Sequence, residues 1–237
     1  MPPKMLGILG GLGPMATVYF YELVTRHTKA ACDQDHIDII INSRATTPDR
    51  TRFILGQSQD DPFDIMAADA ARLVTFGAEM LAIPCNTAHY FYDRLNQTIP
   101  VPILNMVEET VLEAKTHGCR RVGILATSGT VKTGTYARMC ERHGLEFVCP
   151  DEAHQQDLMN VIYGDIKQGK HPDMARFFAV ADSLKRQGCT RVILGCTELS
   201  IIKKDEKLDA FYLDSMSVLA KNAITTFGRT PIGFEKE

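Results

Sequence analysis

Residues 77–87 read GAEMLAIPCNT, and residues 188–198 read GCTRVILGCTE, 111 positions later. In both segments a glycine precedes a cysteine by eight residues, with an apolar run between them. Two further pairs recur in the same order at nearly the same spacing: GILGGLG at 7–13 with GILATSG at 123–129, and ILNMVEETVLEA at 103–114 with YLDSMSVLAKNA at 212–223. These matches predict two copies of one unit of about 110 residues, a usual size for a domain.

Short apolar runs alternate with longer amphipathic segments along the whole chain. The expected strands are residues 5–9, 36–42, 79–84, 101–105, 120–126, 145–149, 190–195 and 209–214. The expected helices lie near residues 14–30, 62–76, 106–117, 130–143, 152–169, 172–187 and 215–228. Continuous apolar strands separated by helices predict parallel sheets covered on both faces. The fold class is therefore α/β, with two similar lobes related by pseudo-two-fold symmetry.

The repeat also predicts how the chain is divided. We expect residues 1–103 plus 209–237 to form a first lobe, and residues 104–208 to form a second. Ligands of open parallel sheets bind at the carboxyl ends of the strands. If the two lobes face each other, those ends meet in one cleft.

Composition narrows the range of functions. The chain has 237 residues with a formal charge of −3, and no block of like charge indicates a nucleic acid or a membrane surface as partner. No secretion signal or membrane span is recognisable near the start. Seven cysteines without a C-x-x-C pair argue against a disulfide framework and favour a reducing, cytoplasmic location.

Cys85 and Cys196 each stand where a strand ends and a helix is expected to start. A helix N-terminus carries partial positive charge and free N–H groups, so it lowers the pKa of a thiol and also binds a carboxylate. Two such thiols facing one cleft suit inversion at a carbon atom, where one group removes a proton and the other adds one to the opposite face. The remaining cysteines are interpreted as structural: Cys32, Cys119, Cys140, Cys149 and Cys189.

The residues also suggest two other chemistries. Cys85, His89 and Cys196 could together bind zinc, but they lack any recognised ligand spacing. Residues 11–16 (GLGPMA) fit the glycine pattern of a dinucleotide-dependent oxidoreductase. The second expected strand, however, ends in INSRA, without an acidic residue for a ribose hydroxyl. That hypothesis also leaves the repeated cysteines unexplained.

The segments GILGGLGPMAT, PCNTAH and GCTEL together resemble the aspartate/glutamate racemase family, over essentially the whole chain. The resemblance implies two α/β lobes, an active site between them, catalysis by two cysteines, no pyridoxal phosphate, and commonly a dimer, so a homodimer is expected. We expect no metal site. It implies that Cys196 removes the α-proton of the L-isomer and Cys85 that of the D-isomer.

The resemblance also implies a shell of substrate-binding residues. The segment TPDRTRFILG places a substrate arginine at Arg50, with Arg52 as its neighbouring competitor, and VIYGDIKQGK places a lysine at Lys167. A guanidinium matches a carboxylate in a bidentate pair, so Arg50 suits a dicarboxylic amino acid. The candidates for holding the α-carboxylate are Asn86, Thr87, Thr127 and Thr197. Glu198 stands where glutamate racemases often have histidine, which favours aspartate and offers a group to manage the proton of Cys196.

Several activities stay open beside aspartate racemisation. Glutamate or a broader range of amino acids could be the substrate, since one methylene discriminates weakly in any pocket. Hydantoin racemases, maleate isomerases and arylmalonate decarboxylases resemble the same scaffold, and the decarboxylases keep only one cysteine of the pair. A non-enzymatic alternative is a two-lobed protein whose cleft closes on an amino acid.

Overall fold

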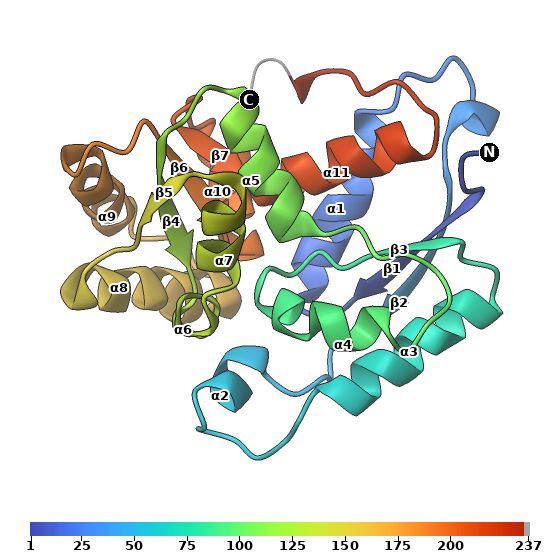
Figure 1. Cartoon of the computed structure of the whole chain (residues 1–237), viewed down its shortest axis with the longest axis horizontal. Helices are drawn as coiled ribbons and strands as arrows, with labels where there is room; N and C mark the ends of the chain where they lie inside the picture. Colours follow the sequence, from blue (N-terminus) through green and yellow to red (C-terminus); the bar gives the residue numbers. More distant parts are fainter. Residues whose placement is uncertain (235–237) are drawn as a thin grey trace.

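A computed structural model describes residues 1–234 as two parallel sheets with helices around them (Figure 1). The strands are β1 (Met5–Gly10), β2 (Asp38–Ser43), β3 (Met80–Ala82), β4 (Arg121–Ala126), β5 (Glu146–Val148), β6 (Arg191–Gly195) and β7 (Tyr212–Asp214). The helices are α1 (Pro14–Arg26), α2 (Arg50–Ile54), α3 (Phe63–Thr75), α4 (Tyr92–Asn96), α5 (Met106–Thr116), α6 (Ser128–Thr133), α7 (Thr135–His143), α8 (Glu152–Met159), α9 (Met174–Arg186), α10 (Thr197–Glu206) and α11 (Ser215–Thr226).

The two sheets have the same topology. The first has the order β2-β1-β3 and the second β5-β4-β6-β7, with every pairing parallel. An isolated parallel bridge joins Ile103 to Leu81 of β3. The chain near residue 103 therefore lies beside β3 in the first sheet, as β7 lies beside β6 in the second. The three repeated sequence segments therefore occupy equivalent places in the two sheets. The predicted α/β class with two similar lobes is confirmed.

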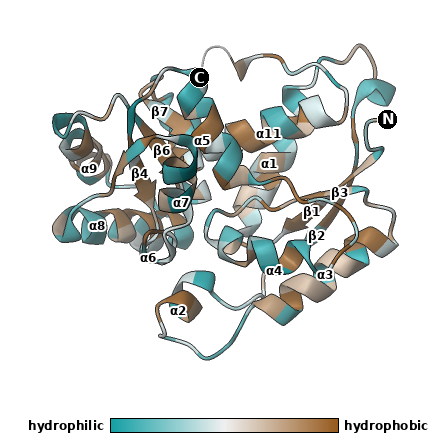
Figure 2. Ribbon diagram, in the orientation of Figure 1, coloured by the Kyte–Doolittle hydropathy of each residue, from teal (hydrophilic) through white to brown (hydrophobic). Residues whose placement is uncertain are grey.

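Each sheet is covered by helices on both faces, and Figure 2 shows strands β1 and β4 as largely hydrophobic. In the first lobe, apolar residues of α1 and α11 pack with Leu6 and Ile8 of β1. Residues of α3 and α4 pack with Leu81 of β3 in a separate cluster. In the second lobe, α9 and α10 pack with Val192 and α5 and α7 with Val122. Both lobes thus bury continuous apolar strands, as the sequence pattern predicts.

Two helices cross between the lobes. Helix α5 follows the bridge at Ile103 but buries Val107 and Val111 with the strands of the second lobe. Helix α11 follows β7 but buries Leu219 and Ala223 against the first lobe. The two helices therefore connect the lobes through buried contacts.

One predicted boundary needs correction. Residues 209–214 were expected in the first lobe, but β7 pairs with β6 through Val192↔Tyr212 and Leu194↔Asp214. The strand therefore extends the second sheet, because the chain returns to the first lobe only at α11. The rest of the division into lobes stays a prediction.

Several elements differ from the expected ones. The expected strand at 101–105 forms only the bridge at Ile103, and the helix expected at 130–143 is divided into α6 and α7 by Gly134 at φ +63°. The helix expected at 152–169 changes from α8 to a π-helix (Asn160–Asp165) and a 3-10 turn (Ile166–Gln168). Helices α2 and α4 were not among the expected segments, whereas α10 begins directly after Cys196, where a helix start was expected. Within residues 1–234, the helices are too short or too polar to cross a bilayer.

The turn between β1 and α1 requires a glycine at position 11. Gly11 has φ +82°, and a Cβ there would lie 2.4 Å from the backbone nitrogen and carbonyl carbon of Arg44. Gly56 has a similar φ of +75°, but a Cβ there would meet nothing within 4 Å. Substitutions at these two glycines therefore distinguish the effect of backbone strain alone from that of strain combined with a steric clash.

Replacing Gly11 by alanine should destabilise the protein more than replacing Gly56 by alanine. In Gly56→Ala, the only expected cost is that of placing alanine in the left-handed conformation, about 1–2 kcal/mol. In Gly11→Ala, the new Cβ must also displace the Arg44 backbone. Urea unfolding followed by circular dichroism measures both free energies of unfolding. Equal losses in the two variants would contradict the close approach at Gly11.

Candidate active site

One cavity between the lobes collects the predicted site residues. The space between its side chains is about 290 Å³, including the part that is open to solvent. Its lining residues are Leu12, Asp49, Arg50, Thr51, Cys85, Asn86, Thr87, Thr127, Tyr163, Lys167, Cys196, Thr197 and Glu198. All nine residues singled out from the sequence are present. Because β1, β3, β4 and β6 all end at this cavity, the carboxyl ends of the two sheets face each other there.

Cys85 lies in a tight turn after β3 and is 5% exposed. Its backbone N–H donates to the Ile83 carbonyl at 2.7 Å. The Nε2 of His89 accepts from the Met106 backbone N–H at 3.1 Å, so its Nδ1 carries the proton and donates to the Cys85 carbonyl at 2.9 Å. Burial lowers the pKa of His89, which keeps the ring neutral. With both nitrogens in hydrogen bonds, His89 holds the Cys85 turn and offers no nitrogen for zinc.

Cys196 is the N-cap residue of α10 and is 4% exposed. Its Sγ donates to Glu198 Oε2 at 3.0 Å. Burial raises the pKa of Cys196 well above its ordinary value, and the Glu198 carboxylate raises it further. The expectation that the helix N-terminus lowers the pKa of this thiol is therefore wrong, because burial and a neighbouring negative charge outweigh the helix dipole. The equivalent cysteines of the two repeats have different surroundings.

Glu198 joins Cys196 to Lys167. Its Oε1 forms an ion pair with Lys167 Nζ, and its Oε2 also accepts from the Thr197 hydroxyl at 3.4 Å. Burial opposes ionisation of Glu198, but the charge of Lys167 prevails and holds the pKa of the carboxyl below its ordinary value. Burial also disfavours the ammonium of Lys167, whose pKa is nevertheless raised by Glu198. Lys167 was expected to face a substrate carboxylate, but it already forms an ion pair with Glu198. Two N–H groups of its ammonium remain for a ligand.

Arg50 is buried at the start of α2. Its guanidinium donates to the backbone carbonyls of Leu12 at 2.6 Å and Pro48 at 3.0 Å. Its Nε is buried without a hydrogen-bond partner, and no carboxylate within residues 1–234 lies within ion-pair distance. A buried guanidinium with an unused donor is costly unless an anion binds it. Arg52, the competitor, is exposed.

A cluster of threonine hydroxyls joins the two lobes beside the cysteines. Thr87 Oγ1 lies 3.0 Å from the hydroxyls of both Thr127 and Thr130. The hydroxyl of Thr51 donates to Thr127 at 3.3 Å. Thr127 is also the N-cap of α6 and accepts from the Thr130 backbone N–H. The predicted Thr87 and Thr127 therefore lie together, although their hydroxyls already bind one another.

Asn86 bridges the lobes away from the thiols. Its Oδ1 accepts from the Tyr136 hydroxyl at 2.6 Å, and its Nδ2 donates to the Ser215 hydroxyl at 3.0 Å. Ser215 in turn donates to the Leu194 carbonyl at the end of β6. One amide hydrogen of Asn86 is left for a ligand, so its main contacts fix the Cys85 turn to the second lobe.

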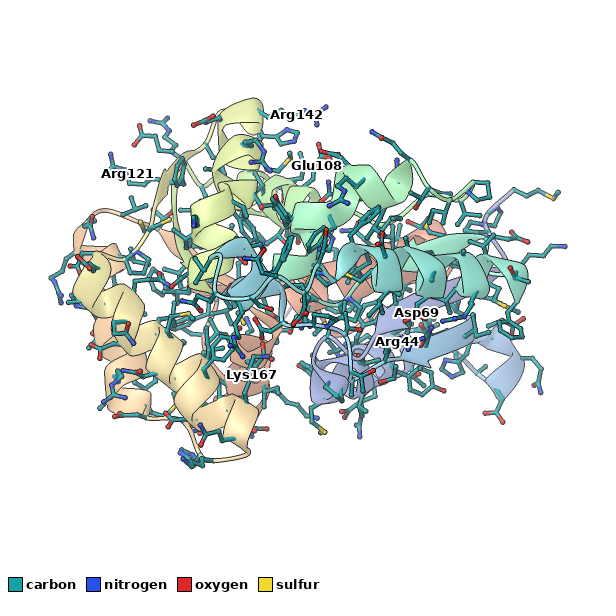
Figure 3. All side chains as sticks on the ribbon, turned by 90° about the horizontal axis from the view of Figure 1, so that it is seen from below. Arg44, Asp69, Glu108, Arg121, Arg142 and Lys167 are labelled. Atoms are coloured by element: carbon teal, nitrogen blue, oxygen red, sulfur yellow. The ribbon has the colours of Figure 1, made fainter. Side chains whose placement is uncertain are left out.

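Residues 44–62 carry Arg50 across the cavity. Arg44 anchors the beginning of this segment to the buried Asp69 of α3 through bonds of 2.5 and 2.8 Å, and Figure 3 labels both side chains. At its tip, Asp49 accepts from the Tyr163 hydroxyl of the second lobe at 3.3 Å. Figure 3 shows Lys167 between the lobes, close to this crossing. The segment therefore closes the cavity by contacts with both lobes.

Sequence reasoning missed four lining residues: Leu12, Asp49, Thr51 and Tyr163. Asp49 and Thr51 flank Arg50, and Tyr163 lies four residues before Lys167. Three of the four residues could therefore have been suggested by their closeness in sequence to predicted site residues. Among the cysteines taken as structural, Cys119, Cys140 and Cys189 are buried and Cys149 is half-buried. Cys32 is exposed, contrary to that interpretation, because it precedes a short 3-10 turn at the surface.

Comparison with known proteins agrees with this geometry. A broad-specificity amino-acid racemase of Bacillus subtilis is 30% identical over 230 residues, covering 94% of this chain and 98% of the relative. The structure of an aspartate racemase of Picrophilus torridus superposes with a TM-score of 0.82 at 28% identity, covering 97% of this chain and 96% of that one. A putative Asp/Glu racemase of Yersinia pestis superposes with a TM-score of 0.80 at 25% identity, covering 94% and 98%.

The model of the Asp/Glu/Hydantoin racemase family matches residues 9–223, which include every residue lining the cavity. This chain therefore belongs to the Asp/Glu/hydantoin racemase family and is an amino-acid racemase.

Proposed function

We propose that this racemase interconverts L- and D-aspartate by a two-base mechanism in the cavity between its lobes. The observation that carries the proposal is that Cys85 and Cys196 occupy equivalent positions of the two repeats and line one cavity. A substrate between the lobes would present one face of Cα to each. The aspartate racemase of Picrophilus torridus supports the choice of substrate.

In the proposed reaction, one thiolate removes the α-proton while the other group, as a thiol, donates a proton to the opposite face. The bonding pair left at Cα delocalises into the α-carboxylate and then takes up the new proton. Each turnover reverses the protonation states of the two sulfurs. Following the resemblance, Cys196 acts as base on the L-isomer and Cys85 on the D-isomer.

Glu198 would manage the proton of Cys196. The thiol already donates to Oε2, and Lys167 holds the carboxyl ionised. When Cys196 must act as a base, its proton passes to Glu198, which leaves a thiolate and a neutral carboxyl. When Cys196 acts as an acid, the thiol is ready as it stands. Glu198 is then a positioning and proton-holding residue.

Arg50 is proposed as the carboxylate-binding residue. Its buried Nε without a partner would donate to a substrate oxygen. Charge that develops on the substrate during proton removal is stabilised by donors fixed in advance in a dry site. The remaining N–H groups of Lys167 would add a second contact for the other carboxylate of aspartate.

The proposal includes catalysis without pyridoxal phosphate. That cofactor needs a lysine that reacts as a free amine. Lys167 is the lysine among the lining residues, and Glu198 keeps it as an ammonium. Proton removal would instead depend on the thiols and on Arg50. Assembly as a homodimer and a cytoplasmic location stay predictions.

A broad-specificity amino-acid racemase is the second candidate. Lys167 already pairs with Glu198, so Arg50 is the cation in the cavity without an ion-pair partner. One such cation is enough for the α-carboxylate that every amino acid has. The Bacillus subtilis relative points the same way. Comparing aspartate with glutamate and alanine as substrates separates the two candidates.

Incubation of L-aspartate with the protein in D₂O, without added cofactor, should place deuterium at Cα and produce D-aspartate. Cys85→Ser and Cys196→Ser should each slow racemisation by about a thousandfold, within the range of general acid–base catalysis. NMR follows the loss of the α-proton, and chiral chromatography follows the isomers. Cys149→Ser, outside the cavity, is the matched control.

Two outcomes of this experiment would overturn the proposal. Ligand binding without any exchange would identify an amino-acid-binding protein, and isomerisation of maleate alone would identify the sister activity. If the rate of α-proton exchange were unchanged in both serine variants, the two-base mechanism would be ruled out.

Replacing Arg50 by glutamine should raise KM for aspartate about 10–100-fold, because a charge-assisted contact of about 1.5–3 kcal/mol is lost. Arg52→Gln, two residues away and exposed, should leave KM unchanged. Steady-state kinetics measures both, and the melting temperature checks that Arg50→Gln folds. A rise in KM for Arg52→Gln alone would show that Arg52, and not Arg50, binds the substrate carboxylate.

Glu198→Gln should shift the alkylation of Cys196 to lower pH. The Glu198 carboxylate raises the pKa of this thiol, so removing the negative charge lowers that pKa and increases the thiolate fraction at any given pH. Iodoacetamide labelling across pH 6–10, read by peptide mass spectrometry, follows Cys196 separately from the other cysteines. Glu206→Gln, at the far end of the same helix, is the control. A profile that moves to higher pH would contradict the proton-holding role.

A further inference from the structure

One buried side chain contacts the chain neighbours of both cysteines. Tyr136 lies in the first turn of α7 and is 2% exposed. Its hydroxyl donates to Oδ1 of Asn86, the residue that follows Cys85, at 2.6 Å. Its ring lies against Gly195, the residue that precedes Cys196, because a Cβ added to that glycine would be 2.9 Å from Cε2 of the ring. The phenol therefore extends from the neighbour of one cysteine to the neighbour of the other.

The ring has a fixed place against the strand that ends in Cys196. It packs in the core of the second lobe with Ile124 and Ile193. A glycine within a strand often marks the close approach of another group to the backbone, and Gly195 has this role toward the ring. Burial raises the pKa of the Tyr136 hydroxyl, which therefore keeps its proton and remains a hydrogen-bond donor.

The amide of Asn86 is held from both sides. While Oδ1 accepts from Tyr136, Nδ2 donates to the Ser215 hydroxyl at 3.0 Å, and Ser215 donates to the Leu194 carbonyl of β6 at 2.7 Å. Asn86 is 2% exposed, so the loss of either bond would leave a buried polar group unpaired. The turn that contains Cys85 is therefore joined to the end of β6 by two routes, one through the phenol and one through Ser215.

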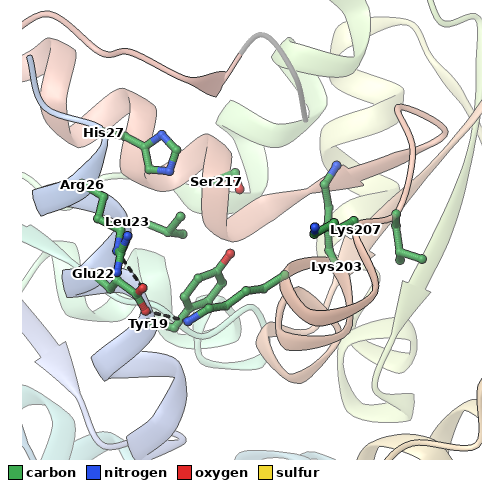
Figure 4. Close-up of a pocket in the computed structure, with 10 residues that line it drawn as sticks. Tyr19, Glu22, Leu23, Arg26, His27, Lys203, Lys207 and Ser217 are labelled. Carbon is green, nitrogen blue, oxygen red and sulfur yellow. Dashed lines mark hydrogen bonds and ion pairs between the residues drawn. The ribbon is translucent and has the colours of Figure 1, made fainter.

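Two other contacts between the lobes act elsewhere. The hydroxyls of Thr87 and Thr127 join the lobes at the end of β4. At the surface, Glu22 of α1 binds Lys204 of α10 at 2.7 Å, and Figure 4 shows Glu22 across from the end of α10. Both side chains of this ion pair are partly exposed, and such pairs contribute little to stability. Among these contacts, the one through Tyr136 is buried and reaches β6.

We propose that Tyr136 is a positioning residue that sets the separation of the two catalytic thiols. The residues lining the cavity do not include it, so the phenol acts through Asn86 and Gly195 and not on the substrate. Two sulfurs that reach one Cα from opposite faces lie about 7 Å apart, and a misplacement of about 1 Å can cost about a hundredfold in rate. The placement of the thiols stands on these contacts, and its effect on rate rests on the proposed function.

Cross-linking with a propanediyl bis-methanethiosulfonate, a reagent of similar reach, tests the separation without substrate. Each end forms a disulfide with one cysteine sulfur and releases methanesulfinate. Peptide mass spectrometry measures the Cys85–Cys196 cross-link as a fraction of the protein modified at both cysteines. Tyr136→Phe, which keeps the ring but loses the hydroxyl, should form at most about half as much cross-link as the wild type.

The matched control for the cross-link is Lys204→Gln, which removes the surface ion pair between the lobes and should behave like the wild type. A cross-link that is absent from the wild type, or equally abundant in Tyr136→Phe, would overturn the proposal. This measurement needs no activity, so it gives its result even if the proposed racemase function fails.

Steady-state racemisation of aspartate tests the effect on rate. Tyr136→Phe should lower kcat about 10–100-fold and change KM by less than about twofold, because Arg50 is held by other contacts. Tyr92→Phe, which loses a hydroxyl that donates to the Ile103 carbonyl outside the cavity, should keep the wild-type kcat. Melting temperatures check that both variants fold. A kcat for Tyr136→Phe equal to that of Tyr92→Phe, or a change confined to KM, would overturn the positioning role.

Discussion

The site depends on one constraint, that two parallel sheets direct their carboxyl ends toward the same cavity. Strands β3 and β6 end there with Cys85 and Cys196, while β1 and β4 end there with Leu12 and Thr127. A hydrogen bond across the gap supports this arrangement, because Asn86 of the first lobe accepts from the Tyr136 hydroxyl of the second. The exchange of α5 and α11 between the lobes adds two buried connections. A movement of one lobe relative to the other would therefore change the distance between the two thiols.

Much of this could be predicted from the sequence, since apolar strands and the spacing of glycine and cysteine are local patterns. The position of β7 could not, because a three-residue strand joins whichever sheet edge its backbone reaches. The pairing of Lys167 with Glu198 was also missed. These residues are 31 positions apart, and the contact depends on an irregular π-helix after α8. The surroundings of a charge follow from long-range packing, which a sequence pattern does not contain.

The segment that carries Arg50 illustrates the same division. Its arginine is recognisable from the motif, but its burial results from three separate anchors. Arg44 ties the segment to α3, Leu12 accepts from the guanidinium, and Tyr163 holds Asp49 from the other lobe. A guanidinium kept dry in this way is worth more to a carboxylate than the same group in water, because little solvent has to be displaced when the ligand binds.

The repeat gives the two cysteines equivalent backbone positions, yet the residues two places further on differ. Thr87 follows Cys85, whereas the charged Glu198 follows Cys196. A racemase that returns to its starting state must balance two half-reactions whose products differ in which sulfur carries the proton. Burial and then the Glu198 carboxylate raise the pKa of Cys196, so its thiol is the favoured form, and in the proposed mechanism the ligand-free protein therefore favours the state in which Cys196 donates. The Lys167 charge limits this bias, because it opposes proton transfer to Glu198 and draws the thiolate toward itself.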